Sequence, residues 1–157
     1  HDEKAMSEIM WCGSLSHNGL TGLGGNKDFA THQLGHGISE KFDITHGDSL
    51  TAVWGSWARY VLDTDVSRFA RFARNVWGVE QADDREAALA GIAAQETFFR
   101  SLDMPVCIPA LSCGRQDEDG LADLASRCSY GKTRTIGTFR TLNYEDMLAI
   151  YHKANNA

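Results

Sequence analysis

Apolar residues recur every three or four positions along most of the chain, which is the spacing of amphipathic helices. No segment alternates apolar and polar residues over the length of a strand, so the predicted fold class is all-α. The segment 103–112 contains both prolines, Pro105 and Pro109, and is predicted to be a loop. Periodicity and capping residues predict helices at 3–17, 28–42, Thr45 to Tyr60, 65–77, 83–101, 116–128 and 143–152.

The first predicted helix has an apolar stripe that includes Met6, Ile9 and Met10. Asn18-Gly19 ends this helix, and the glycine-rich residues 22–26 form a flexible connector to the next one. The stripe also contains Gly13 and His17.

The helix that begins near residue 45 has both a start signal and a candidate core face. Thr45 and Asp48 stand at the spacing of a capping box, in which each side chain bonds the backbone of the other residue. We expect an aromatic-rich face of this helix to be buried. Its members are Leu50, Val53, Trp54, Trp57 and Tyr60.

Composition narrows the class of protein. With 157 residues, 43% of them hydrophobic, the chain suffices for one globular domain. A net charge of −6 without a basic stripe argues against a nucleic-acid partner. No apolar run approaches a membrane span of about 18 residues and no signal-peptide pattern opens the chain, so we expect no membrane partner and a cytoplasmic location. The four cysteines show no Cys-x-x-Cys spacing, which argues against a thiolate zinc site.

Three of the six histidines fall between residues 32 and 46. His32 and His36 are one helical turn apart and therefore share a face of the helix. His46 stands at a predicted helix start, where the positive end of the helix dipole favours the neutral, metal-binding imidazole. The spacing favours a metal site, and the other interpretation is a pair of surface histidines with a capping His46.

Several other signals carry little weight. Gln33 stands where the His-Glu-x-x-His motif of metalloproteases needs a glutamate base, which disfavours hydrolysis. The glycine-rich segment 22–27 lacks a preceding strand and the Gly-Lys-Ser/Thr ending of a phosphate loop, so we interpret it as a turn, like 129–133. The remaining weak signals are His1, His17 and His152, taken singly, and an arginine stripe expected to face solvent at Arg68, Arg71 and Arg74.

A set of short motifs runs through nearly the whole chain in one order. They lie at 8–11, 16–20, 28–32, 41–47, 60–63, 69–73, 76–79, 98–105 and 135–139. In these segments the chain resembles the iron-containing (group III) alcohol dehydrogenases, and specifically their butanol dehydrogenase-like branch. The resemblance implies that residues 1–157 form the all-helical, metal-binding C-terminal domain of a two-domain enzyme.

The resemblance also implies roles for individual residues. His32 and His46 match the two metal ligands of the family's C-terminal half, and His36 matches a non-ligand histidine that lines the cleft near the nicotinamide. His36 is therefore the candidate catalytic and cofactor-binding residue. Asn18 matches the family's Asn-Gly turn and is a second cofactor-binding candidate, with a plain turn residue as the other interpretation.

The implied activity is that of a metal-dependent NAD(P)H alcohol dehydrogenase or aldehyde reductase. The implied cofactors are Fe²⁺ or Zn²⁺ and NADPH or NADH, and the implied partners are a small alcohol or aldehyde and an N-terminal nucleotide-binding domain. That domain would supply the aspartate and histidine that complete the metal shell. The chain opens with His1-Asp2-Glu3-Lys4 instead of an initiator methionine, so we expect a fragment or a processed product. Because it would hold only two of the family's four protein ligands and little of the dinucleotide site, we expect it to be inactive alone and to bind metal weakly. Similar enzymes also make a homodimer possible.

Departures from the family pattern lie beside the histidines. Gly35 and Gly37 flank His36, where the branch commonly has glutamates, and Asp48-Ser49 stands where small apolar residues or glycine are usual. These changes bear on substrate preference and metal affinity more than on reaction class.

Two alternatives stay open. The first is a non-catalytic helical domain that binds metal or another protein and keeps the histidines without a catalytic partner half. The second is a metal-dependent hydrolase or lyase on a helical bundle, which the missing glutamate beside His32 and His36 disfavours.

Overall fold

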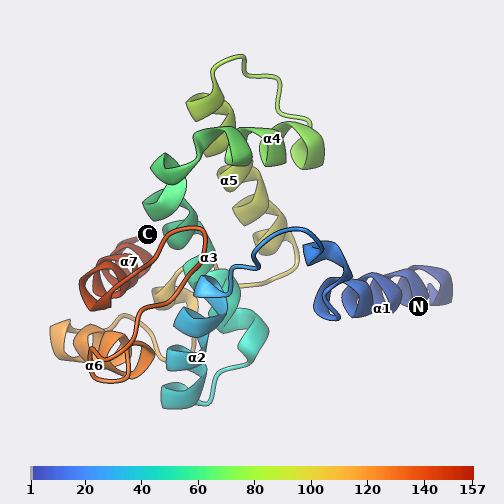
Figure 1. Cartoon of the computed structure of the whole chain (residues 1–157). Helices are drawn as coiled ribbons and strands as arrows, with labels where there is room; N and C mark the ends of the chain where they lie inside the picture. Colours follow the sequence, from blue (N-terminus) through green and yellow to red (C-terminus); the bar gives the residue numbers. More distant parts are fainter. Residues whose placement is uncertain (1) are drawn as a thin grey trace.

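The computed structural model describes residues 2–157 and leaves His1 outside that range. All seven predicted helices are present, and the described residues contain no strand, only a single bridge between Ile136 and Leu142 (Figure 1). The all-α prediction is therefore confirmed. The helices are α1 (Glu3–His17), α2 (Ala30–Phe42), α3 (His46–Val61), α4 (Val66–Trp77), α5 (Asp84–Ser101), α6 (Glu118–Cys128) and α7 (Tyr144–Asn156), with short 3-10 turns η1 (Leu20–Gly22), η2 (Leu62–Thr64) and η3 (Ile108–Ala110).

Side-chain caps explain why the predicted helix starts agree closely with the observed ones. Asp65, Asp83 and Asp117 each accept a hydrogen bond from a backbone N–H in the first turn of the following helix. Asn143 and Asp146 form a reciprocal capping box at α7. These acceptors satisfy N–H groups that have no partner inside the helix.

Several details of the predicted helices are wrong, and among them α6 begins at Glu118, two residues late. Helix α2 begins at Ala30, two residues late, because the Asp28 carboxylate accepts the Ala30 N–H at 2.6 Å and holds the preceding backbone out of the helix. Thr45 precedes α3 but its side chain makes no capping hydrogen bond. Helix α7 continues to Asn156, four residues beyond the predicted end at His152.

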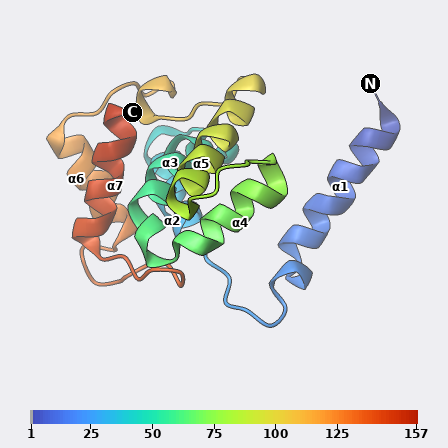
Figure 2. The same cartoon turned by 90° about the horizontal axis from the view of Figure 1, so that it is seen from above.

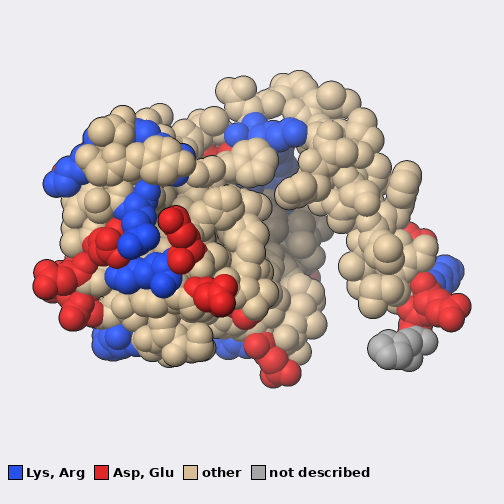
Figure 3. Space-filling model, turned by 90° about the horizontal axis from the view of Figure 1, so that it is seen from below, with Lys and Arg blue, Asp and Glu red and all other residues tan. Residues whose placement is uncertain are grey.

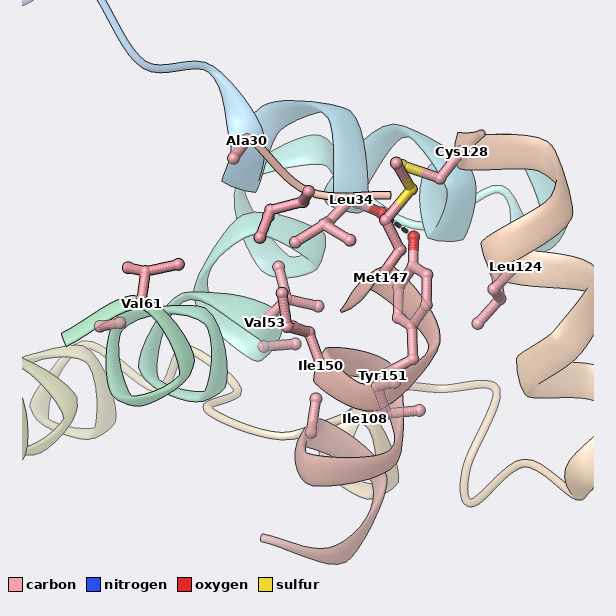
Figure 4. Close-up of a cluster of buried hydrophobic side chains, with 14 of the residues drawn as sticks. Ala30, Leu34, Val53, Val61, Ile108, Leu124, Cys128, Met147, Ile150 and Tyr151 are labelled. Carbon is pink, nitrogen blue, oxygen red and sulfur yellow. Dashed lines mark hydrogen bonds between the residues drawn. The ribbon is translucent and has the colours of Figure 1, made fainter. Parts of the chain in front are cut away.

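The core lies where α2, α3, α6 and α7 meet. Figure 4 shows Leu34, Val53, Leu124 and Ile150 converging there from the four helices, all of them fully buried. Tyr151 also crosses this core and donates a hydrogen bond from its hydroxyl to the Leu34 carbonyl at 2.7 Å. That bond gives the buried phenol a partner and ties α7 to α2.

Glycine lets α2 lie close to its neighbours. A Cβ added at Gly35 would lie 2.9 Å from Leu50 Cδ2 and 3.0 Å from Ser49 Oγ of α3. One added at Gly37 would lie 3.0 Å from the Tyr151 hydroxyl. Both glycines, which depart from the family pattern, are therefore at helix contacts and have a packing reason.

The aromatic-rich face of α3 is buried only in part. Val53 is fully buried, whereas Trp54, Trp57 and Tyr60 pack against the core and are half-buried, so the expected burial of this face is partial. The residues that fill the contact of α3 with the core are mostly small, such as Ala52 and Ala58. The indole rings instead line a hollow between α3 and α4.

Helix α1 projects away from the other six helices, as the view from above shows (Figure 2). It has no buried residue, and its main contact is with η1. The predicted apolar stripe is exposed, since Met6, Ile9 and Met10 are 52%, 65% and 68% accessible, and Trp11 on the same helix is 63% accessible. An isolated helix of 15 residues is marginal in water, so this face lacks the packing that normally stabilises such a helix.

Charged side chains are mixed in sign on the face shown in Figure 3, and the described part of that face has no extended basic surface. On α2 and α6, Lys41 pairs with Asp123 at 2.9 Å, and Arg127 pairs with the same carboxylate at 3.0 Å. None of the helices within residues 2–157 is both long enough and apolar enough to span a membrane. All four cysteines are free thiols.

We expect Tyr151→Phe to lower the free energy of unfolding by about 1–2 kcal/mol, because it leaves the buried Leu34 carbonyl without the hydroxyl donor. Tyr130→Phe is the matched control, since Tyr130 is 64% exposed and should change stability by less than about 0.5 kcal/mol. Urea unfolding followed by circular dichroism measures both. Equal effects of the two substitutions would contradict the assignment.

Stability should fall as the pH rises from 9 to 11. Burial raises the pKa of the Cys128 thiol from 9.0 to about 11. In this window the unfolded chain has lost the thiol proton while the folded chain keeps it, so the unfolded state binds fewer protons and the free energy of unfolding decreases, by about 2 kcal/mol overall. Urea titrations across this range should give a shallower decline for Cys128→Ala, and an identical decline would refute the thiol's part.

Candidate metal centre

The structure brings the three predicted site histidines together from two helices. His32 and His36 lie one turn apart near the start of α2, and His46 is the first residue of α3. The ring centroids of His32 and His46 are 5.2 Å apart, and those of His36 and His46 are 4.8 Å apart. Residues that are ten and fourteen positions apart in the sequence thus meet at one point because α2 and α3 pack side by side.

These spacings can be compared with what a metal ion requires. Two imidazoles that bind one ion at about 2.1 Å in tetrahedral geometry have ring centroids about 5 Å apart. The His32–His46 pair meets this requirement at 5.2 Å, and so does His36–His46 at 4.8 Å. His32 and His36 are 6.4 Å apart, which is too far for both rings to join His46 on one tetrahedral ion without movement.

The described residues hold no complete metal site. Within residues 2–157, no group of three or more histidine, cysteine, aspartate or glutamate side chains is arranged to hold a metal ion. A tetrahedral ion needs four donors, so the described residues fit two of the positions of a site and leave the others to be filled from elsewhere.

The electrostatics favour neutral rings at the two candidate ligands. Partial burial lowers the pKa of His32, and the neighbouring His46, His36 and His17 lower it further. Burial and the nearby His36 also lower the pKa of His46. Because metals bind the unprotonated imidazole nitrogen, both shifts make the rings better ligands at neutral pH.

A buried serine fixes the first turn of α3, which carries His46. Ser49 is fully buried; its hydroxyl donates to the His46 carbonyl at 2.8 Å and accepts a hydrogen bond from the Ser39 hydroxyl of α2 at 2.8 Å. This chain of hydrogen bonds links His46 to α2, the helix of His32. The departure from the family pattern at Ser49 thus has a structural role beside the candidate site.

His17 lies beside the candidate site, although its sequence context was only a weak signal. The ring of His17, at the end of α1, lies 6.3 Å from that of His32, so His32 has histidine neighbours on three sides. Phe29 packs edge-on against His32 at 5.4 Å. The Asn18-Gly19 turn was the available signal, because it sends the chain back from the end of α1 toward α2.

Asn18 has a clear local role. Its side-chain oxygen accepts the Leu20 N–H at 3.0 Å, and its own N–H caps the end of α1. This is the geometry of a turn residue. Asn18 does not line the cavity beside His32, although its neighbours Ser16 and His17 do.

The fold and the sequence both match known proteins. NADH-dependent butanol dehydrogenase A of Clostridium acetobutylicum is 34% identical over 155 residues, which is 98% of this chain and 39% of that protein. NADH-dependent butanol dehydrogenase A from Thermotoga maritima superposes with a TM-score of 0.88 at 25% identity, over 98% of this chain and 39% of that one. The aldehyde reductase YqhD from E. coli gives a TM-score of 0.89 at 25% identity, over 98% and 40%.

These matches place the chain within longer proteins, since it spans about two fifths of the length of each of these relatives. The family description "Fe-containing alcohol dehydrogenase family, C-terminal" matches residues 1–155. The resemblance inferred from the motifs is confirmed by both the sequence and the fold. The chain therefore belongs to the iron-containing alcohol dehydrogenase family and corresponds to the C-terminal part of its members.

Proposed function

We propose that this chain is the metal-holding helical part of an NAD(P)H-dependent alcohol dehydrogenase or aldehyde reductase. The observation that carries the proposal is the 5.2 Å spacing of His32 and His46, in a chain that belongs to this family. The relatives named above are described as NADH-dependent butanol dehydrogenases and an aldehyde reductase. The proposed substrates are accordingly small alcohols and aldehydes, with NADH or NADPH as the hydride carrier.

His32 and His46 are the proposed ligands of this half of the site. When bound, Fe²⁺ or Zn²⁺ would act as a Lewis acid that stabilises negative charge on the carbonyl oxygen. Two neutral imidazoles leave the positive charge of such an ion undiminished, which suits that task. The Ser49 hydrogen bonds hold His46 at a fixed distance from α2, so that the pair needs little rearrangement.

His36 is proposed to act beside the ligands. The centroid of its exposed ring lies 4.8 Å from the centroid of the His46 ring, close enough for both to face the same reacting group. An imidazole can accept and donate a proton near neutral pH. We assign His36 either to the orientation of the nicotinamide or to delivery of a proton from its ring nitrogen to the alkoxide oxygen. Asn18 remains a cofactor-binding candidate by resemblance alone.

The proposed partner is a nucleotide-binding part of the same enzyme, as in a protein of the relatives' length. Two features support this: the chain offers only two metal ligands, and the apolar face of α1 is uncovered. Both lie on one side, because His17 at the end of α1 borders His32. A segment that covers α1 would be well placed to bring further ligands to the histidines. Residues 1–157 would then be its C-terminal domain; a homodimer and a cytoplasmic location remain predictions.

The exposed face of α1 favours one other function, a non-catalytic domain that binds a protein through this helix. Four apolar side chains more than half exposed on one helix are typical of an interaction surface. Both candidate functions use the exposed face of α1, and a measurement of hydride transfer distinguishes them.

Metal binding tests the ligand assignment directly in this chain. We expect weak binding of Zn²⁺, which His32→Ala and His46→Ala each reduce by about tenfold or more, because each removes one of two donors. Isothermal titration calorimetry measures the affinity. His36→Ala should retain most of it, and His152→Ala, which removes an imidazole on α7 that pairs with Glu118, is the matched control. A loss in His36→Ala with none in His32→Ala would reverse the assignment.

Turnover tests the proposed reaction. The full-length gene product, reconstituted with Fe²⁺ or Zn²⁺, should oxidise NADH or NADPH in the presence of butanal. His46→Ala should lower kcat/KM by about a hundredfold or more, since it removes a ligand of the ion that polarises the carbonyl. Absence of turnover with any aldehyde or metal, in a protein that still binds a partner through α1, would favour the interaction domain.

A further inference from the structure

We propose that the cavity beside His32 selects substrates with an anionic end group, such as linear aldehydes that carry a carboxylate. The inference rests on the proposed function, because it assigns the reacting end of the substrate to the histidines. The inference concerns the end of the substrate that lies away from the reacting carbonyl and from the histidines.

The cavity has a volume of about 470 Å³ and borders the candidate metal centre at His32. Its lining also includes His17, Phe29 and two basic side chains, Lys27 and Arg68. Lys27 comes from the connector before α2, and Arg68 comes from α4. A small linear molecule with one end at His32 therefore has cationic groups within the same cavity for its other end.

Neither cation has an anionic partner. Among residues 2–157, no carboxylate lies within ion-pair distance of Lys27 or Arg68. The Lys27 side chain lies against the η1 turn, with its Nζ beside Gly19 and its aliphatic stem beside Gly22. The Arg68 guanidinium lies 5.9 Å from the Phe139 ring centroid. Both charged groups thus keep their hydrogen-bond donors available for a ligand.

The carboxylates nearby are already used. Asp28 accepts the N–H groups of Ala30, Thr138 and Phe139 at 2.6, 2.8 and 2.7 Å. Asp65 accepts the Ser67 hydroxyl and the Arg68 N–H. Asp28 lines the cavity and keeps its charge, but both of its oxygens already accept backbone N–H groups. The free donors of the cavity are therefore those of Lys27 and Arg68, and a ligand that supplies acceptors matches them.

A second hollow continues from the first and is aromatic. It has a volume of about 750 Å³ and shares Gly25, Asn26, Asp28 and Arg68 with the cavity beside His32. Its walls contain half-buried aromatic rings from α3 and α4, namely Trp54, Trp57 and Phe72. An apolar body next to the acid group would be covered there, and its arrival would change the environment of two indoles.

The proposed reaction is the reduction of the aldehyde group to an alcohol by NAD(P)H. Hydride from NAD(P)H adds to the aldehyde carbon, a proton adds to the oxygen, and NAD(P)⁺ leaves with the alcohol. The carboxylate is unchanged and contributes only binding energy, which a charge-assisted hydrogen bond to a guanidinium supplies well.

A binding experiment tests the cavity without metal, cofactor or turnover. ¹⁵N-labelled chain is titrated with 4-phenylbutanoate and with 4-phenylbutan-1-ol, and the indole N–H signals of Trp54 and Trp57 report binding. We expect the carboxylate to bind about tenfold more tightly than the alcohol. Arg68→Met and Lys27→Met should each reduce this preference. Arg71→Met is the matched control, because Arg71 lies one turn along α4 and lines neither cavity.

Equal binding of acid and alcohol would overturn the inference, as would absence of binding or a preference that survives Arg68→Met as fully as Arg71→Met. A second comparison separates this result from the proposed function. If the full-length gene product reduces butanal well and 4-oxobutanoate poorly, the dehydrogenase stands and the anionic preference fails. If the carboxylate binds selectively but no aldehyde is reduced, the cavity stands and the proposed function fails.

Discussion

The close contact between α2 and α3 is the constraint on which the candidate site depends. Gly35 allows the two helices to approach until Ser49 lies against α2, and the buried Ser49 hydroxyl joins Ser39 to the backbone of His46. A larger residue at Gly35 would push on Leu50 and Ser49, and thereby separate His32 from His46. The 5.2 Å spacing of the two rings is thus a property of helix packing more than of the histidines themselves.

The site and the uncovered helix belong to one side of the molecule. His17 ends α1 beside His32, while the apolar side chains of α1 are exposed. The incomplete ligand set and the exposed helix therefore lie close together. An ion bound by His32 and His46 requires further donors, and α1 lacks apolar packing. One additional segment in a protein as long as its relatives could meet both, which is why we treat the chain as half of a site.

The connector between α1 and α2 also contacts the loop before α7 and lines the cavity beside His32. Asp28 binds the backbone at Thr138 and Phe139, so the segment is fastened to the loop before α7 and carries Lys27 to the cavity edge. Arg68 reaches the same cavity from α4. Arg68 and Arg71 are exposed, as expected for the arginine stripe, whereas Arg74 is half-buried. Arg74 donates hydrogen bonds to the Gln81 and Ala82 carbonyls of the loop before α5 and pairs with Asp84 at the start of that helix.

The sequence by itself determined the helices, because their periodicity and caps are local: Asp65, Asp83, Asp117 and Asn143 act within one turn. It also identified the family and singled out His32, His36 and His46. Only the tertiary structure decided which helix faces are buried and which distant side chains lie together. The stripe of α1 is exposed, the aromatic face of α3 is half-buried, and His17, Lys27 and Arg68 join His32. Burial and proximity are set by how distant helices pack, and spacing along one helix carries no information about its neighbour.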